Sequence, residues 1–216
     1  MKAKKIFKII GIVILILVVI VLIYAIRNFT IIRKLQKKIE QYSSSNNFHI
    51  VSNSTQGDTT ININYYTKDG KQAMILRRTI GDQTIKMSVY YNGSRTDTFY
   101  ETKDSKQAKL NSSNELMPIS IYNGLETDSN FQTFILCMVS FVKIANVNQK
   151  ECYLIKNFKS PVSLNGESKN EIYVEKNTGL LTKSVLNNQV MNREYEFDNV
   201  DDSIFAEPDI SQYTLK

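Results

Sequence analysis

An apolar run without a single charged residue occupies residues 9–26, between Lys8 and Arg27. It consists almost entirely of Ile, Val and Leu. Its eighteen residues, wound as one helix, just cross the hydrocarbon core of a bilayer. The run therefore predicts a transmembrane helix at residues 9–26, a short basic tail at residues 1–8, and a separate polar region of about 170 residues.

The apolar run is longer than the hydrophobic region of a cleavable signal peptide, and no Ala-x-Ala cleavage pattern follows it. We therefore expect a retained signal anchor that spans the cell membrane once. Basic residues do not decide its orientation, because four precede the run and five follow it closely. A short basic tail and a strand-rich region typical of exported proteins favour a cytoplasmic N-terminus and an extracytoplasmic C-terminal domain.

Basic charge is concentrated around the span. Before Ser43 the chain carries a net charge of +8, whereas from Ser43 onward it carries −2. Lysine and arginine beside a membrane span attract anionic lipid headgroups, at about 1 kcal/mol per residue. The nearly neutral remainder has no basic stripe, so we expect the membrane as a partner and no nucleic acid.

Residues 27–46 predict a juxtamembrane helix and loop, with Thr30 as the helix N-cap. Apolar residues recur there at helical spacing, and Lys and Arg fill the other face. The apolar stripe consists of Ile31, Ile32, Leu35, Ile39 and Tyr42. Such a helix either packs on the domain that it precedes or lies on the membrane surface.

From Phe48 the apolar residues alternate with polar ones, which is typical of strands. Turn residues separate the runs, and Asn92-Gly93 is the strongest hairpin signal among them. The predicted strands cover residues 59–67, 71–80, 83–91, 94–102 and 106–110. A spacing of ten to thirteen residues between turns is that of an antiparallel meander.

A second group of elements follows an irregular stretch. Residues 129–144 open with capping residues and predict a helix that is apolar almost all round, and hence buried on several sides. Turn signals, Asn165-Gly166 among them, separate further strands. These strands are predicted at residues 151–158, 170–176, 180–186 and 190–197.

This order predicts an α+β fold: an N-terminal transmembrane helix followed by a curved antiparallel sheet of at least eight strands, a half-barrel covered by helices. If helix 129–144 plugs the hollow of the sheet, an apolar gap remains that suits a hydrophobic ligand. The predicted lining from the sheet is Ile61, Ile63, Tyr65, Met74, Leu76, Ile85, Met87, Val89 and Phe99. The predicted lining from the helix is Phe131, Phe134, Ile135, Met138 and Phe141.

Two segments in the last third carry a family resemblance. Residues 172–181 contain Thr178-Gly-Leu between two strands, and residues 202–209 read Asp-Ser-Ile-Phe-Ala-Glu-Pro-Asp. In these motifs and in element order, residues 47–213 resemble the bacterial lipoprotein-carrier superfamily, with its LolA- and LppX-like half-barrels. The resemblance implies that residues 47–216 bind acyl chains or lipidated proteins. Carriers of that family are soluble or lipid-anchored, so the span favours a tethered role here.

Two functions therefore stay open. The first is a membrane-tethered domain that binds a lipid, a lipoprotein or another hydrophobic ligand. The second is an envelope protein-interaction or stress-sensing module that uses the same fold without a ligand. We expect no enzyme and no cofactor, because the sequence has no Gly-x-Ser-x-Gly, Walker loop or Gly-x-Gly-x-x-Gly.

The remaining chemistry-bearing residues have simple interpretations. His49 is the only histidine and is interpreted as structural, so no zinc site is expected. The acidic group Asp198, Asp201 and Asp202 is interpreted as a solvated turn, with a calcium site as the alternative. Cys137 and Cys152 are interpreted as buried small side chains, with a disulfide as the alternative.

Overall fold

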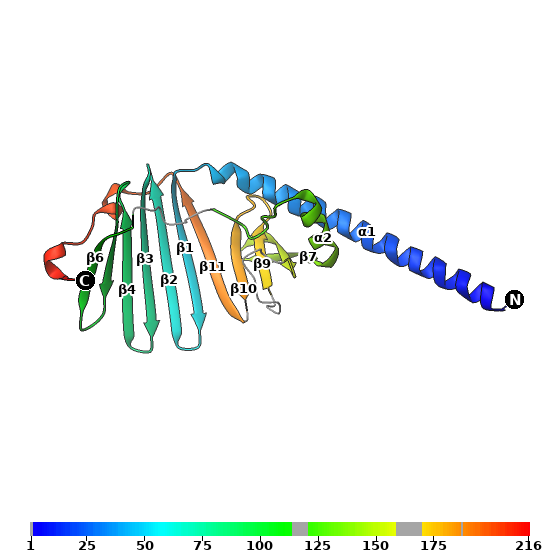
Figure 1. Cartoon of the computed structure of the whole chain (residues 1–216), viewed down its shortest axis with the longest axis horizontal. Helices are drawn as coiled ribbons and strands as arrows, with labels where there is room; N and C mark the ends of the chain where they lie inside the picture. Colours follow the sequence, from blue (N-terminus) through cyan, green and yellow to red (C-terminus); the bar gives the residue numbers. More distant parts are fainter. Residues whose placement is uncertain (1, 114–120, 159–169, 187) are drawn as a thin grey trace. The chain divides into compact units, whose positions relative to one another are not determined.

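The computed structural model describes residues 2–113, 121–158, 170–186 and 188–216 (Figure 1). The predicted turn at Asn165-Gly166 lies outside these residues. The chain divides into two compact units, each built from two segments. Unit 1 comprises Met1–Ile39 and Tyr122–Leu181, and unit 2 comprises Glu40–Ile121 and Thr182–Lys216.

Helix α1 runs without a break from Lys2 to Ser43. It is long and apolar enough to cross a membrane once, and the side chains of its apolar run are mostly exposed in the isolated chain. The prediction of a separate helix capped by Thr30 is wrong. The Thr30 hydroxyl instead donates to the carbonyl of Ile26 at 2.9 Å, a bond that lies inside a continuing helix.

The second half of α1 belongs to the core of unit 1. Ile32, Leu35 and Ile39 are buried, and Ile31 packs against the same core. Of the two alternatives for this stripe, the structure therefore shows packing on the fold. A helix that combines an exposed apolar part and a buried apolar part explains why the apolar pattern continues past Arg27.

Unit 1 also contains α2 (Asn130–Val139), β7 (Phe141–Val147), β8 (Lys150–Lys156) and β9 (Asn170–Glu175). The prediction of one helix over residues 129–144 is wrong in its second half. The hydroxyl and amide of Ser140 both bond to the Leu136 carbonyl and end α2. From Phe141 onward the chain pairs with β8, with Val142 opposite Ile155. β-Branched residues such as Val142 favour strands, and β8 provides the hydrogen-bonding partner here.

The core of unit 1 lies between α1, α2 and these strands. Its buried members are Ile32, Leu35, Leu125, Cys137, Val142, Ile155, Phe158, Ile172, Val174 and Leu181. Cys137 and Cys152 are both buried and both free. Their interpretation as buried small side chains is confirmed, and burial raises the pKa of the Cys137 thiol to about 11.

Unit 2 is mainly an antiparallel meander. Its strands are β1 (Asn47–Gln56), β2 (Thr59–Lys68), β3 (Lys71–Ile80), β4 (Gln83–Tyr91), β5 (Thr96–Glu101), β6 (Lys106–Ser113), β11 (Gln189–Phe197) and β12 (Thr214–Leu215). Strand β10 (Leu181–Leu186) pairs with β11. Two short 3-10 helices, η1 (Asp202–Phe205) and η2 (Ile210–Gln212), precede β12.

Hydrogen-bonded neighbours follow the order β12-β6-β5-β4-β3-β2-β1-β11-β10-β9-β8-β7. The two ends of this order are different strands, so the sheet is open. Only β12 runs parallel to its neighbour among the pairs described. The prediction of an α+β fold with a large, curved, antiparallel sheet is confirmed, with twelve strands in the described residues.

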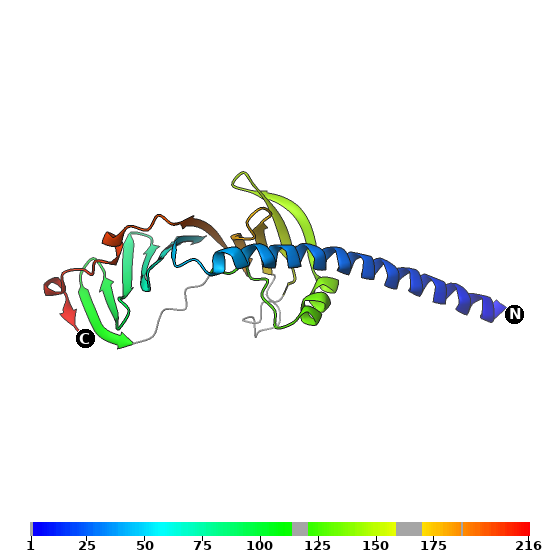
Figure 2. The same ribbon diagram turned by 90° about the horizontal axis from the view of Figure 1, so that it is seen from above.

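One face of the unit 2 sheet is closed by the C-terminal segment (Figure 2). Ala73, Tyr90, Phe99 and Ala108 form a buried cluster there. Ile204, Phe205 and Tyr213 pack against it from the segment that carries η1 and η2. Because the C-terminal segment covers this face, the other face of the strands is the candidate for ligand contact.

Candidate functional site

An apolar face runs across β2, β3 and β4 within unit 2. The pairing register opposes Ile63 to Leu76 and Leu76 to Met87, and on one flank it opposes Tyr65 to Met74 and Met74 to Val89. On the other flank the exposed Arg78 lies between Ile61 and Ile85. Because side chains alternate along a strand, these residues project from the same side of the sheet. We call the following set the apolar face: Ile61, Ile63, Tyr65, Met74, Leu76, Ile85, Met87 and Val89.

The apolar face is only partly covered. Val89 is 8% exposed, whereas Ile85 is 39% exposed and the other members are half-buried. On the adjoining strand β1, Phe48 and Ile50 project from the same side and are each 4% exposed. The face is therefore closed beside β1 and open toward the far ends of β2, β3 and β4.

Phe99 does not belong to the apolar face, so its placement there by sequence is wrong. It pairs with Ser88, and it is Thr98 that pairs with Val89. A shift of one residue along a strand reverses the side on which a side chain lies. Phe99 instead contacts Tyr90 and Tyr213 edge to face, at ring-centroid distances of 5.8 and 5.1 Å.

The predicted lining residues from the helix lie in unit 1. Phe131, Ile135 and Phe141 are exposed, and Met138 is half-buried. Phe134 packs edge to face on Phe29 of α1, with ring centroids 5.9 Å apart. The described contacts of α2 are therefore with the first unit's own core, through Cys137 and Leu136.

Two buried polar atoms without a hydrogen-bond partner lie at one end of the apolar face. They are Oγ1 of Thr67 and Oε1 of Gln72, which face each other across β2 and β3. Both continue the alternation of the apolar face, Thr67 after Tyr65 and Gln72 before Met74. Buried polar groups are paired in the great majority of cases, so two neighbouring exceptions indicate missing donors.

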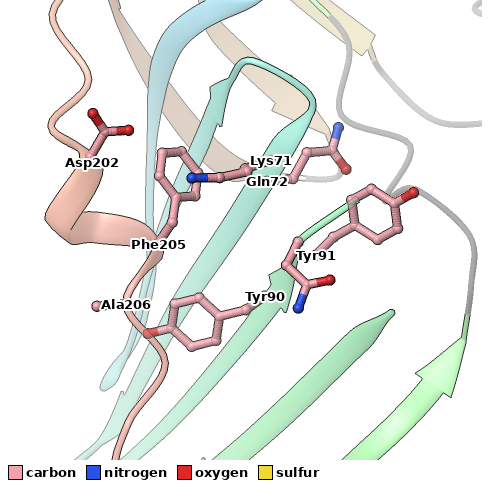
Figure 3. Close-up of a pocket in the computed structure, with 8 residues that line it drawn as sticks. Lys71, Gln72, Tyr90, Tyr91, Asp202, Phe205 and Ala206 are labelled. Carbon is pink, nitrogen blue, oxygen red and sulfur yellow. The ribbon is translucent and has the colours of Figure 1, made fainter. Parts of the chain in front are cut away.

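Gln72 also borders a pocket of about 300 Å³ at the ends of β3 and β4 (Figure 3). Gln72 and Tyr91 lie on one side of the strand ends, and Tyr90 and Phe205 lie on the other. The residues that line the pocket are Lys71, Gln72, Tyr90, Tyr91, Asn92, Asp202, Phe205 and Ala206. The pocket is thus mixed in character, with aromatic walls and a lysine and a carboxylate at its rim.

Sequence reasoning missed Thr67, Gln72 and Tyr91 as candidate site residues because it followed apolar side chains alone. The available signal was the alternation itself. It extends by one step beyond Tyr65 to Thr67 and, on the next strand, from Met74 back to Gln72.

His49 lies on the opposite side of the sheet in a chain of polar side chains. Its Nδ1 is 3.3 Å from Glu196 Oε2, and its Nε2 is 3.0 Å from Asn64 Oδ1. The ring also stacks on Tyr66 at a centroid distance of 4.2 Å. Asn64 continues the chain by donating to Asn62 Oδ1 at 2.6 Å. These contacts account for both ring nitrogens, which agrees with a structural histidine.

The acidic group near the C-terminus serves the fold. Asp201 caps η1 by accepting from the Ser203 amide at 2.7 Å, and this bond lowers the pKa of the carboxyl group. Asp202 accepts from Lys68 at 3.0 Å. In the described parts of the chain, these carboxylates do not gather into a cluster that could hold a metal ion.

A second charged group lies beneath the C-terminal segment. The side chain of Asp97 is fully buried, with Arg95 Nε 2.8 Å from its Oδ2. Arg95 Nη2 is also 3.4 Å from Glu207 Oε2. Burial raises the pKa of Glu207, and the negative charge of Asp97 raises it further, against the opposing effect of Arg95.

No family model and no curated protein matches this sequence. Among solved structures, the chain is similar to a DUF1329 family protein from Desulfovibrio piger. The two share 10% identity over 85% of this chain and 97% of that chain, with a TM-score of 0.31. A likeness of this degree carries no argument about function, so the resemblance to lipoprotein carriers rests on the sequence motifs.

Proposed function

We propose that unit 2 binds an amphipathic, lipid-like molecule, with its hydrocarbon part on the apolar face and its polar end near Thr67 and Gln72. One observation carries the proposal. A set of Ile, Leu and Met side chains on β2, β3 and β4 is left half-open around Leu76, with Arg78 at its exposed end. On the opposite side, Ala73, Tyr90 and Phe99 are covered by the C-terminal segment. Open apolar patches of this kind are typical of ligand surfaces.

The hydrocarbon part supplies the affinity. Burying a methylene group contributes about 0.8 kcal/mol, so roughly ten methylenes contribute about 8 kcal/mol before the cost of association is subtracted. Unbranched Met74 and Met87 lie near the centre of the face, where their flexible side chains adapt to a chain of variable shape.

The polar end supplies orientation. Leaving a buried polar atom unpaired costs about 1–3 kcal/mol, and a donor on the ligand removes that cost. The Gln72 oxygen accepts such a donor, and the Thr67 hydroxyl either accepts or donates. The pocket beside Gln72 gives a headgroup room, and its rim carries both the Lys71 ammonium and the Asp202 carboxylate. The proposal assigns binding to this site and no catalytic step.

Leu76→Glu tests the apolar face, because it places a carboxylate among Ile63 and Met87 on the open side. The full chain, in detergent and stripped of loosely held lipid, is titrated with a fluorescent long-chain fatty acid. We expect Leu76→Glu to weaken binding by at least about tenfold, since a charge in an apolar contact costs more than 1.4 kcal/mol. Arg77→Glu is the matched control, because Arg77 is exposed on the same strand and faces the other way.

Gln72→Leu tests the contribution of the ligand's polar end to binding separately from that of its hydrocarbon part. It removes an atom that has no partner, so the free protein keeps its stability, whereas a probe with a polar head binds less tightly. A fatty amide, whose head donates N–H groups to the Gln72 oxygen, should lose more than a methyl ester, whose head only accepts hydrogen bonds, as an ionised fatty acid also does. Equal binding by the parent chain, Leu76→Glu and Arg77→Glu would contradict the proposal and favour the ligand-free interaction module.

A further inference from the structure

Unit 1 exposes a patch of apolar side chains on α2 and at the start of β7. Along α2 the patch recurs every four residues, while Thr133 and Cys137 on the other side of the helix are buried. Phe131 is 75% exposed and Val139 is 65% exposed. We call the following set the α2 patch: Phe131, Ile135, Val139 and Phe141.

Helix α2, which carries most of the α2 patch, lies beside α1 near the end of the apolar run (Figures 1 and 2). Asn28, two residues past the run, is fully buried and donates through Nδ2 to the carbonyls of Cys137 and Ser140, at 3.2 and 3.0 Å. Arg27 Nη1 donates to the carbonyl of Val142 at 3.4 Å. These bonds fix the end of α2 and the start of β7 at the level where α1 emerges from its apolar run.

The apolar run itself is covered by protein at this level. Ala25 is buried and Tyr24 is half-buried, whereas the earlier side chains of the run are exposed. A helix that crosses a bilayer therefore carries α2 to the boundary between acyl chains and headgroups. Among the described residues near this boundary, Arg27 and the exposed Lys143 are cationic and suit phosphate headgroups. Glu126 and Asp128, in the loop before α2, are exposed and acidic.

We propose that the α2 patch inserts into the membrane interface of the leaflet from which α1 emerges. The chain then contacts lipid at two places, through the span and through a short amphipathic helix that lies on the bilayer surface. The exposed side chains of α2 lie next to a helix that faces lipid. Hydrogen bonds from Arg27 and Asn28 to backbone carbonyls, and the ring contact between Phe29 and Phe134, hold α2 in this place.

Single tryptophans test the insertion, because the natural chain contains none. Phe131→Trp, Ile135→Trp and Val139→Trp each replace an exposed apolar side chain, so folding is expected to tolerate all three. The full chain is reconstituted into phosphatidylcholine–phosphatidylglycerol vesicles whose acyl chains carry bromine. Leu17→Trp marks the span, and Asn146→Trp marks an exposed position at the other end of β7.

We expect the three α2 tryptophans to be blue-shifted and quenched by the brominated chains several-fold more than Asn146→Trp, and to approach Leu17→Trp. Emission and quenching like those of Asn146→Trp at all three positions would overturn the proposal, and would assign the α2 patch to a protein partner instead. The buried thiols of Cys137 and Cys152 report folding, because a folded variant leaves both unreactive.

Discussion

Glu207 links the C-terminal segment to the sheet through a charged contact, and the contribution of this contact to stability changes with pH. In the folded chain it lies next to the buried Asp97 carboxylate, and Arg95 bridges the two. Because its pKa is raised on folding, the folded chain keeps a proton on Glu207 that the unfolded chain has already released. This contact therefore contributes most below the ordinary pKa of a glutamate, and its contribution is lost as the pH rises through the raised value.

Glu207→Gln should flatten this pH dependence. Glutamine keeps the shape of the protonated acid and its ability to donate to Asp97, but it does not ionise. Thermal unfolding of the full chain, followed from about pH 4.5 to about pH 8, should show a gain for Glu207→Gln over the parent that grows with pH. Asp104→Asn, in an exposed turn of the same unit, should give no such gain. A constant difference at every pH would contradict the mechanism.

At the scale of residues, alternation predicted most of the apolar face. Ile61, Ile63, Leu76 and Met87 follow from the period of two alone, because turns on both sides of each strand fix its register. Phe99 was assigned to the wrong side because the assignment followed its apolar character and not its register: β5 pairs Tyr91 with Thr96 and therefore Ser88 with Phe99. Unpaired atoms such as Gln72 Oε1 depend on what surrounds them and cannot be read from a sequence.

At the scale of elements, α1 and the turn after β9 fit together through a glycine. Gly179 has φ +77, and a Cβ built on it would lie 2.6 Å from the backbone oxygen of Leu35. Asn123 Nδ2 donates to the Gly179 carbonyl at 3.1 Å, and Lys38 Nζ donates to the Lys176 carbonyl at 2.7 Å. The helix can thus approach the turn only where the side chain is absent.

Gly179→Ala should destabilise unit 1 well beyond the cost of the backbone conformation. Gly70→Ala is the matched control, because Gly70 has φ +79 but open space around it. We expect a loss of about 1 kcal/mol for Gly70→Ala and of about 3 kcal/mol or more for Gly179→Ala, which must also push α1 outward. Reactivity of the buried Cys137 thiol should increase in Gly179→Ala alone. Equal losses of folding free energy in the two variants would contradict the prediction, because the close approach of α1 to Gly179 would then add nothing to the cost of the substitution.

Element type was predicted well where periodicity was long, and poorly where an apolar run changed its structure. The meander from β2 to β4 agrees with the predicted residues almost to the residue. The run over residues 134–142 is almost wholly apolar, so neither a period of 3.6 nor one of two marks the change at Ser140. Pairing with strand β8 determines where the helix ends and the strand begins, and that pairing is a tertiary contact.

At the scale of the whole molecule, element order predicted the fold class but not the division into units. One unit combines the first 39 residues with residues 122–181. No break in composition marks these boundaries, because the same α1 supplies both the span and part of a core. The pairing of β1 with β11, between segments about 140 residues apart, is likewise invisible to local patterns.

We expect the N-terminus to be cytoplasmic and the chain after the apolar run of α1 to be extracytoplasmic. In bacterial cells that express the full chain, Ser105→Cys in an exposed turn should react with a membrane-impermeant maleimide before the cells are opened. Ala3→Cys in the basic tail should react only afterwards. The natural cysteines are buried, so they give little background. The reverse pattern of labelling would assign the opposite orientation.

The unbroken course of α1 has a mechanical consequence. No flexible segment separates the lipid-facing turns of the helix from those that Ile32 and Leu35 bury in a core. In a bilayer, a joint of this kind couples the tilt of the span to the tilt of the core that Ile32 and Leu35 help to form. That core then stays close to the membrane surface, so we expect any molecule that it binds to reach it there.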